Sequence, residues 1–144
     1  MMTDQSKLTA LQEENSALKA ELAALKESKT NYQRMFELSA DALSILDLDS
    51  GCFIECNQAA IDMHGVESEA NFLNLSPADL SPEHQPCGGL SADLAKQRIE
   101  KAFTEGPQVF RWEHSRLDGS TFPCLVSLTA LPSKTQNCIL AIGR

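Results

Sequence analysis

The sequence predicts an α+β fold, in which a five-stranded antiparallel sheet with helices on one face is preceded by a long N-terminal coiled-coil helix. Three observations support this prediction. Apolar residues recur every three or four positions over residues 7–36, which is the spacing of one helix face. Five short segments after residue 40 have the composition and alternation of strands. Turns rich in Gly, Pro and Ser separate these segments from two further helical patterns.

The first helix has the heptad pattern of a coiled coil. Its sequence contains neither Pro nor Gly, so helix propensity agrees with the pattern. Leu at the d positions and the single Asn15 at an a position favour two parallel helices in register, because two Asn15 amides pair only where they meet. An amphipathic helix packed on its own domain is the alternative. The predicted dimer interface consists of Leu8, Leu11, Asn15, Leu18, Leu22, Leu25, Tyr32 and Phe36.

Length and charge limit the classes of protein to consider. The 144 residues suit a dimerisation helix over residues 1–38 and one domain over residues 39–144, and 42% hydrophobic residues permit a packed core. A formal net charge of -8 and the lack of a basic block before the helix argue against nucleic-acid binding. We find neither a membrane-spanning apolar run nor a secretion signal, so we expect a cytoplasmic protein.

The five cysteines do not have the spacing of a metal site. Their number is odd, and no second Cys pair or matching histidines accompany them. We therefore expect no metal, and reduced thiols that serve as small core residues. These cysteines are Cys52, Cys56, Cys87, Cys124 and Cys138.

The first half of the predicted domain begins with a β-hairpin over residues 42–57. Asn57 is placed to cap a short helix over residues 58–64, and Gly65 is placed to end it. The next stretch, residues 67–89, is expected to consist mainly of loops because Ser-Pro and Gly-Gly pairs interrupt it.

The second half of the domain combines one helix with three strands. Ser91 is expected to cap a helix that Gly106-Pro107 stops. Strands are predicted over residues 109–116, 122–131 and 138–142. The last is almost entirely apolar, which predicts a central position in the sheet.

Several segments carry a family resemblance, together with the order of the elements. They are Asp47, Asn57-Gln58-Ala59-Ala60, His64-Gly65-Val66, Ser76-Pro77 to Pro82-Glu83, and Phe110-Arg111-Trp112-Glu113-His114-Ser115-Arg116-Leu117-Asp118-Gly119-Ser120-Thr121-Phe122-Pro123. In these segments the chain resembles a bacterial sensory PAS domain, over about residues 31–144.

The resemblance implies a cytoplasmic, normally dimeric sensor whose N-terminal helix and C-terminal exit transmit a signal. The chain stops at Arg144, where that exit would begin, so we expect it to be the input part of a larger signalling protein, such as a diguanylate cyclase or histidine kinase, in two-component or cyclic-di-GMP signalling. Its effector domain is then missing from this sequence.

The resemblance also bears on cofactors. The photoactive flavin subgroup has an Asn-Cys-Arg-Phe-Leu motif whose Cys forms the flavin adduct, and the haem subgroup has a His on the long helix. Neither feature is present here, so the sequence argues against haem and a covalently reacting flavin and leaves the cofactor unknown. A small-molecule pocket between helices and sheet, or equally a filled core, would be lined by Ile45, Ile54, Asn57, Ile61, Ile99, Phe103, Phe110, Trp112, Val126 and Leu140.

The three histidines are weighed separately. His64 ends the short helix, where interaction with the carbonyl end is favoured over ligand contact. His84 is expected to be solvated. His114 alternates with Trp112 on a strand, and a core position and a pocket wall both stay open.

Two functions follow from these features. The first is a signal-sensing dimerisation module that relays ligand or partner binding through its helices. The alternative is a purely structural homodimerisation module without a ligand. We do not expect an enzyme, because the sequence has no nucleophile elbow and no glycine-rich phosphate loop. Asp47, Asp49 and Glu55 are expected to be solvated charges of the hairpin rather than a catalytic pair.

Overall fold

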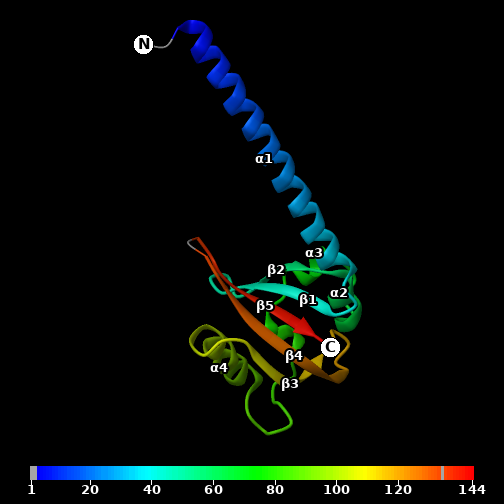
Figure 1. Ribbon diagram of the computed structural model, residues 1–144. Coiled ribbons are helices and arrows are strands. Elements are labelled where there is room, and N and C mark those ends of the chain that lie inside the picture. Colours follow the sequence, from blue (N-terminus) through cyan, green and yellow to red (C-terminus); the bar gives the residue numbers. More distant parts are fainter. Residues whose placement is uncertain (1–2, 134) are drawn as a thin grey trace. The chain divides into compact units, whose positions relative to one another are not determined.

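The structure is a computed structural model, which describes residues 3–133 and 135–144 (Figure 1). The described chain forms two compact units, one ending at Phe36 and the other beginning at Glu37. The predicted order of elements is confirmed. It is α1 (Asp4–Leu38), β1 (Ala42–Asp47), β2 (Phe53–Cys56), α2 (Gln58–His64), α3 (Glu69–Phe72), the 3-10 helix η1 (Pro77–Leu80), α4 (Ser91–Thr104), β3 (Gln108–Ser115), β4 (Thr121–Pro132) and β5 (Asn137–Gly143).

Helix α1 is continuous over 35 residues. At its start the Ser6 amide donates to Thr3 Oγ1 over 3.1 Å, which gives one otherwise unpaired N–H a partner. The predicted interface residues of α1 are exposed in the single chain except Phe36, with Leu8 at 49% and Leu25 at 68%. The coiled-coil dimer stays a prediction, as does a domain boundary after residue 38.

The five strands form one antiparallel sheet in the order β2-β1-β5-β4-β3. The apolar strand β5 lies at its centre, as its composition predicts, and Ile139 is fully buried there. Helices α2 and α4 pack on one face of the sheet, against β1 and β4. That face and the helices enclose the core of the domain.

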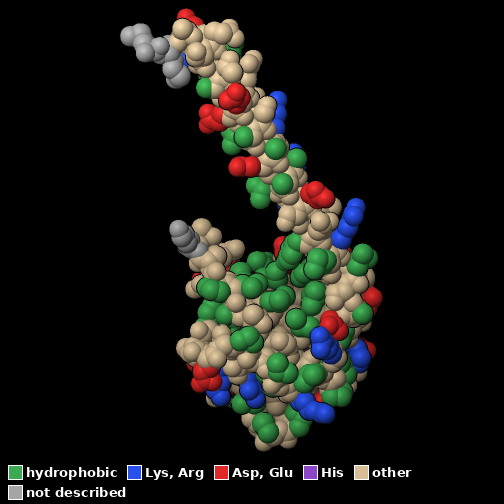
Figure 2. Space-filling view, viewed as in Figure 1, with side chains coloured by type: hydrophobic (Ala, Val, Ile, Leu, Met, Phe, Trp, Pro, Cys, Tyr) green, Lys and Arg blue, Asp and Glu red, His purple; other side chains and the backbone are tan. Residues whose placement is uncertain are grey.

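The opposite face of the sheet is also partly apolar. Figure 2 shows hydrophobic side chains gathered over the strands of this face. Leu125 and Ile54 are exposed here at 43% and 37%. Ile45 and Leu140, which are paired across β1 and β5, share this face. Alternation along the strands therefore separates two sets of apolar side chains, only one of which faces the helices.

Helix α2 begins and ends as the sequence predicts. The Asn57 side chain is fully buried, and its Oδ1 accepts from the Ala60 amide over 3.0 Å. Gly65 ends the helix in the left-handed conformation, with φ of 65°, which glycine adopts without a Cβ clash. Local sequence signals thus determine both ends of the helix that carries His64.

Two predictions about polar side chains are wrong. Ser91 does not cap α4, because Leu90 occupies the cap position and Ser91 Oγ accepts from buried Gln85 over 2.8 Å. Gln85 also bonds both backbone groups of Glu113, so the loop before α4 is attached to β3 through this amide. Asp47 is not solvated but 7% exposed. Its carboxylate accepts from two amides of the following turn, which would otherwise lack partners.

Candidate functional site

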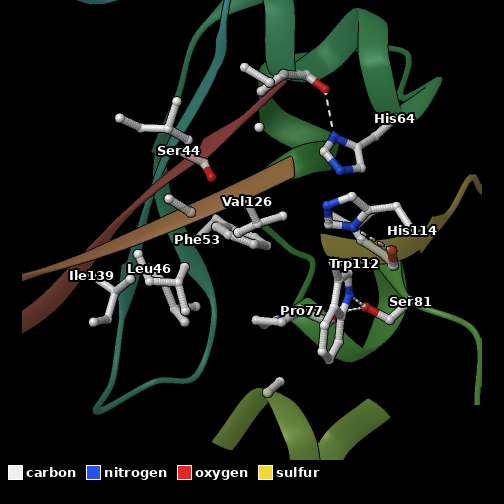
Figure 3. A pocket seen from close by; sticks show the side chains of 18 of the residues that line it. Ser44, Leu46, Phe53, His64, Pro77, Ser81, Trp112, His114, Val126 and Ile139 are labelled. Carbon is white, nitrogen blue, oxygen red and sulfur yellow. Dashed lines mark hydrogen bonds between the residues drawn. The ribbon is translucent and has the colours of Figure 1, made fainter. Parts of the chain in front are cut away.

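A cavity of about 90 Å³ lies between the sheet and the helices (Figure 3). One water needs roughly 10–15 Å³ measured in this way, so the cavity has room for several waters or a small organic molecule. It is smaller than the roughly 300–1,000 Å³ of sites for drug-sized ligands. Most of the lining is apolar, and includes Leu46, Phe53, Phe72, Ile99, Phe110, Trp112, Val126, Leu128 and Ile139.

Four of the ten predicted pocket residues line this cavity. They are Ile99 from α4, Phe110 and Trp112 from β3, and Val126 from β4. The sequence therefore identified part of the wall formed by α4, β3 and β4. Whether the cavity binds a ligand stays a prediction.

The other six predicted residues do not line the cavity, and the phase of the strands explains three of them. On β1 the cavity face carries Ala42, Ser44 and Leu46, so Ile45 faces the other way. Leu140 shares the face of Ile45 because the two are paired. On β2, an irregularity in the pairing with β1 leaves Phe53 on the cavity side and Ile54 exposed.

The remaining three have other places in the fold. Asn57 is occupied by backbone hydrogen bonds around the start of α2. Ile61 is buried in the core beside the cavity lining, and Phe103 is 37% exposed on α4.

Trp112 forms one wall of the cavity and has its polar atom satisfied. Its Nε1–H donates to Ser81 Oγ over 3.0 Å, and Ser81 Oγ donates to Pro77 O over 2.9 Å. The indole meets Phe110 edge to face, with centroids 5.8 Å apart. Because the N–H is already paired, the ring offers the cavity an apolar surface.

The polar end of the cavity is formed by two histidines that the sequence did not pair. His64 ends α2, and its Nδ1 lies 2.9 Å from Ala60 O, consistent with the expected contact with a helix carbonyl. His114 projects from β3, and its Nδ1 lies 3.2 Å from Leu80 O. The two rings meet edge to face, with centroids 4.8 Å apart. Figure 3 shows His64 above His114, with Trp112 below both.

Burial favours the uncharged form of both imidazoles. It lowers the pKa of His114 to about 4, and the electrostatic interaction with neighbouring His64 lowers this pKa further. Burial is also the main cause that lowers the pKa of His64. Since a carbonyl oxygen can only accept, each Nδ1 carries the proton and each Nε2 offers a lone pair. His64 Nε2 is buried and has no hydrogen-bond partner among the described residues.

The pairing of the two histidines could not be read from local patterns. Each had a satisfactory local explanation, a helix end for His64 and an alternating strand for His114. Their contact depends on the tertiary packing that brings the end of α2 next to β3. The one usable signal was that His114 alternates with Trp112, which placed both on the helix-facing side of β3.

The described residues do not form the other kinds of site considered from the sequence. Within 3–133 and 135–144, no three His, Cys, Asp or Glu side chains come together as a metal site would require. No helix in this part of the chain combines the length and apolar character needed to cross a membrane. All five cysteines are free, and Cys56, Cys124 and Cys138 are buried.

Known proteins resemble this chain in sequence pattern and in fold. A family model described as a PAS domain matches residues 40–144. The PAS domain of an HTR-like protein from Haloarcula marismortui is 25% identical, with 88% of this chain and 98% of that chain covered and a TM-score of 0.65. Among curated protein sequences, none matches.

Two further solved structures show the same fold at lower identity. A domain of a sensory box sensor histidine kinase/response regulator from Geobacter sulfurreducens is 24% identical, with 83% and 96% covered and a TM-score of 0.63. The PAS domain of a LuxR-family transcriptional regulator from Burkholderia thailandensis, a complex with ethanol, is 17% identical, with 77% and 94% covered and a TM-score of 0.60. The family match over residues 40–144, the sheet order and the flanking helices agree, and this chain belongs to the PAS domain family.

Proposed function

We propose that this PAS domain senses a small molecule bound in the cavity between its sheet and helices. The observation that carries the proposal is the cavity itself. Its lining is mostly apolar, its polar side chains are Ser44, Ser81 and the two histidines, and His64 Nε2 lacks a partner among the described residues. Ligand sites typically have apolar walls with a few well-placed polar groups. The Burkholderia thailandensis neighbour with ethanol supports a ligand of this small size.

The proposed output runs through a homodimer of parallel α1 helices. The leucines at the a and d positions are 49–68% exposed in the single chain, and a second copy would cover them. In a parallel pair, Glu14 and Glu21 of one helix lie opposite Lys19 and Lys26 of the other. Each such exposed pair contributes only about 0–1 kcal/mol, so these charges favour orientation more than stability.

The connection between α1 and the cavity is short. Only residues 39–41 separate α1 from β1, and the first residue of β1, Ala42, lines the cavity. At the other end of the domain, Arg144 Nε lies 3.0 Å from Asp41 Oδ2. Ligand binding can change helix packing only as far as the ligand prefers one arrangement over the other.

We further propose that the domain is non-catalytic, lies in the cytoplasm and controls an effector in a larger signalling protein. The Geobacter sulfurreducens neighbour, a domain of a sensory box sensor histidine kinase/response regulator, supports this context. A diguanylate cyclase is the other effector considered.

The experiment that tests ligand sensing is native mass spectrometry of the protein as purified, beside a denatured sample. A dimer that carries a small non-covalent mass would support the proposal and give the ligand's chemical class. If no added mass appears, the protein is titrated with small molecules while the fluorescence of Trp112 is followed. Trp112 is the single tryptophan of the chain and lines the cavity. Unchanged fluorescence and melting temperature across a chemically broad set would contradict the proposal.

The structural dimerisation module remains the second candidate. The observation that favours it is the small size of the cavity, about 90 Å³, which a few waters could fill. It predicts full effector output from a folded Trp112→Ala dimer, because no ligand would need the indole wall. Loss of stimulus response in that dimer would favour sensing instead.

A further inference from the structure

We propose that His64 and His114 are the recognition point of the cavity, which selects a small, uncharged, mostly apolar molecule that donates an O–H or N–H hydrogen bond. This inference rests on the proposed ligand-sensing function and specifies its ligand. It assigns a role to two side chains that fold stability alone does not explain.

The first step concerns His64. Its Nδ1–H is used by Ala60 O, so Nε2 can only accept. That atom is shielded from solvent and lacks a partner among the described residues, while the side chain is 7% exposed. A buried acceptor without a donor is unfavourable. A phenylalanine would fill the same space between Phe72 and Phe122 without an unpaired acceptor, but it would lose the hydrogen bond to Ala60 O. The unpaired Nε2 is therefore the feature that a donor entering the cavity would satisfy.

The second step concerns His114. Its Nδ1–H is directed to Leu80 O, which leaves Nε2 as another acceptor. Figure 3 shows the nitrogen of His64 that has no hydrogen bond turned toward His114, and both rings at the same end of the cavity. Two neighbouring acceptors favour a donor group and disfavour a carbonyl or ether oxygen.

The third step excludes charged ligands. Among the described residues, no Asp, Glu, Lys or Arg lines the cavity. A carboxylate or ammonium group would therefore be buried without a counter-ion, which is costly. Two basic side chains stack on nearby rings without lining the cavity: Arg98 on Phe110 at 4.6 Å and Arg116 on Phe122 at 4.3 Å. The volume of about 90 Å³ limits the ligand to a few heavy atoms.

The test compares three probes of similar size, 1-butanol, its isomer diethyl ether and the butylammonium ion. The full chain is titrated with each while Trp112 fluorescence and the ¹⁵N resonance of His64 Nε2 are recorded. We expect 1-butanol to bind about three- to tenfold more tightly than diethyl ether, the equivalent of one hydrogen bond, and to shift the Nε2 resonance. Butylammonium should bind more weakly than either.

Two variants test whether His64 causes the preference for 1-butanol. In His64→Phe the preference for 1-butanol over diethyl ether should fall, because one of the two acceptors is gone and only His114 Nε2 is left. His84→Phe is the matched control, since His84 is exposed and does not line the cavity, and it should keep the preference. If His64→Phe does not fold, the wild-type preference and the Nε2 resonance decide the outcome.

The possible failures are distinguishable. Equal binding of alcohol and ether without an Nε2 shift would overturn the histidine assignment and leave ligand sensing intact. Butylammonium bound as tightly as the alcohol would overturn the selection against charge. No binding of any probe would contradict the inference together with the proposed small-molecule function.

Discussion

The apolar row of a and d residues on α1, which we call its seam, has side chains similar to those of the domain core. The two differ in that the seam is exposed and the core is buried. Leu18 and Leu25 of the seam are 55% and 68% exposed, whereas Leu80 and Ile139 of the core are 2% and 0% exposed. The domain buries its apolar residues within one chain, but α1 can do so only against another surface. Stability of the domain should therefore be independent of protein concentration, while stability of the paired helices should depend on it.

The largest effect is expected in the core. Phe72 is fully buried and lies against Phe53, with ring centroids 4.9 Å apart. Phe72→Ala should lower the free energy of unfolding of the domain by about 3–5 kcal/mol, because it leaves a cavity. Urea unfolding followed by Trp112 fluorescence measures this loss. Leu117→Ala, at a position 55% exposed, is the control and should change stability by less than about 0.5 kcal/mol.

The next effect is expected in the seam. Leu18→Ala should weaken helix pairing by about 2 kcal/mol per helix while leaving the unfolding of the domain unchanged. Sedimentation equilibrium measures the dissociation constant, and Glu27→Ala at an outward heptad position is the control. If Leu18→Ala instead destabilised the domain and left the oligomeric state unchanged, α1 would pack on its own domain.

Acid should lower the stability of the domain but not the stability of the paired α1 helices. The pKa of His114 is about 4 in the folded protein and 6.5 as the ordinary value, so the unfolded state binds more protons between these values. The stability that depends on neutral His114 is therefore complete above about pH 6.5 and is lost as the pH falls toward 4, by up to about 3 kcal/mol. Helix α1 contains no His, so pairing should not follow this profile.

Urea unfolding at about pH 7.5 and about pH 5 measures the effect of acid. The wild-type protein should lose stability between them, and His114→Phe should lose less. Equal losses in the two proteins would show that other groups cause the acid sensitivity.

The smallest effect concerns specificity rather than folding. Asn15→Val should raise the stability of helix pairing by about 1 kcal/mol per helix and relax register or oligomer number, since a buried amide is kept at some cost. Analytical ultracentrifugation and cross-linking measure these changes. Unchanged stability in a strict dimer would contradict the pairing of Asn15 residues.

The fold could be predicted from the sequence because its signals are local. The Asn57 cap, the Gly65 stop and the apolar run of β5 each specify structure within a few residues. Prediction was wrong for Ser91, whose hydroxyl is instead used by Gln85, an interaction that requires the loop to fold back.

The cavity could be predicted only in part, because alternation gives the period of a strand but not which face is covered. Both faces of β1 and β5 carry apolar residues, so Ile45 and Leu140 were placed on the wrong one. On β3, Trp112 and Phe110 were large enough to indicate the covered face, and they were placed correctly. The contact of His64 with His114 is tertiary, and periodicity carries no information about it.

The buried Asn57 amide links three parts of the domain at once. It accepts from the Leu43 and Ala60 amides and donates to Asp41 O, each over 3.0 Å. Asp41 belongs to the connector that leads from α1, and Ala60 belongs to the helix that ends in His64. Asn57 therefore connects the residues that follow α1 to the start of α2 through hydrogen bonds. A ligand that displaces α2 from the cavity must either break these hydrogen bonds or pull the connector along with the helix.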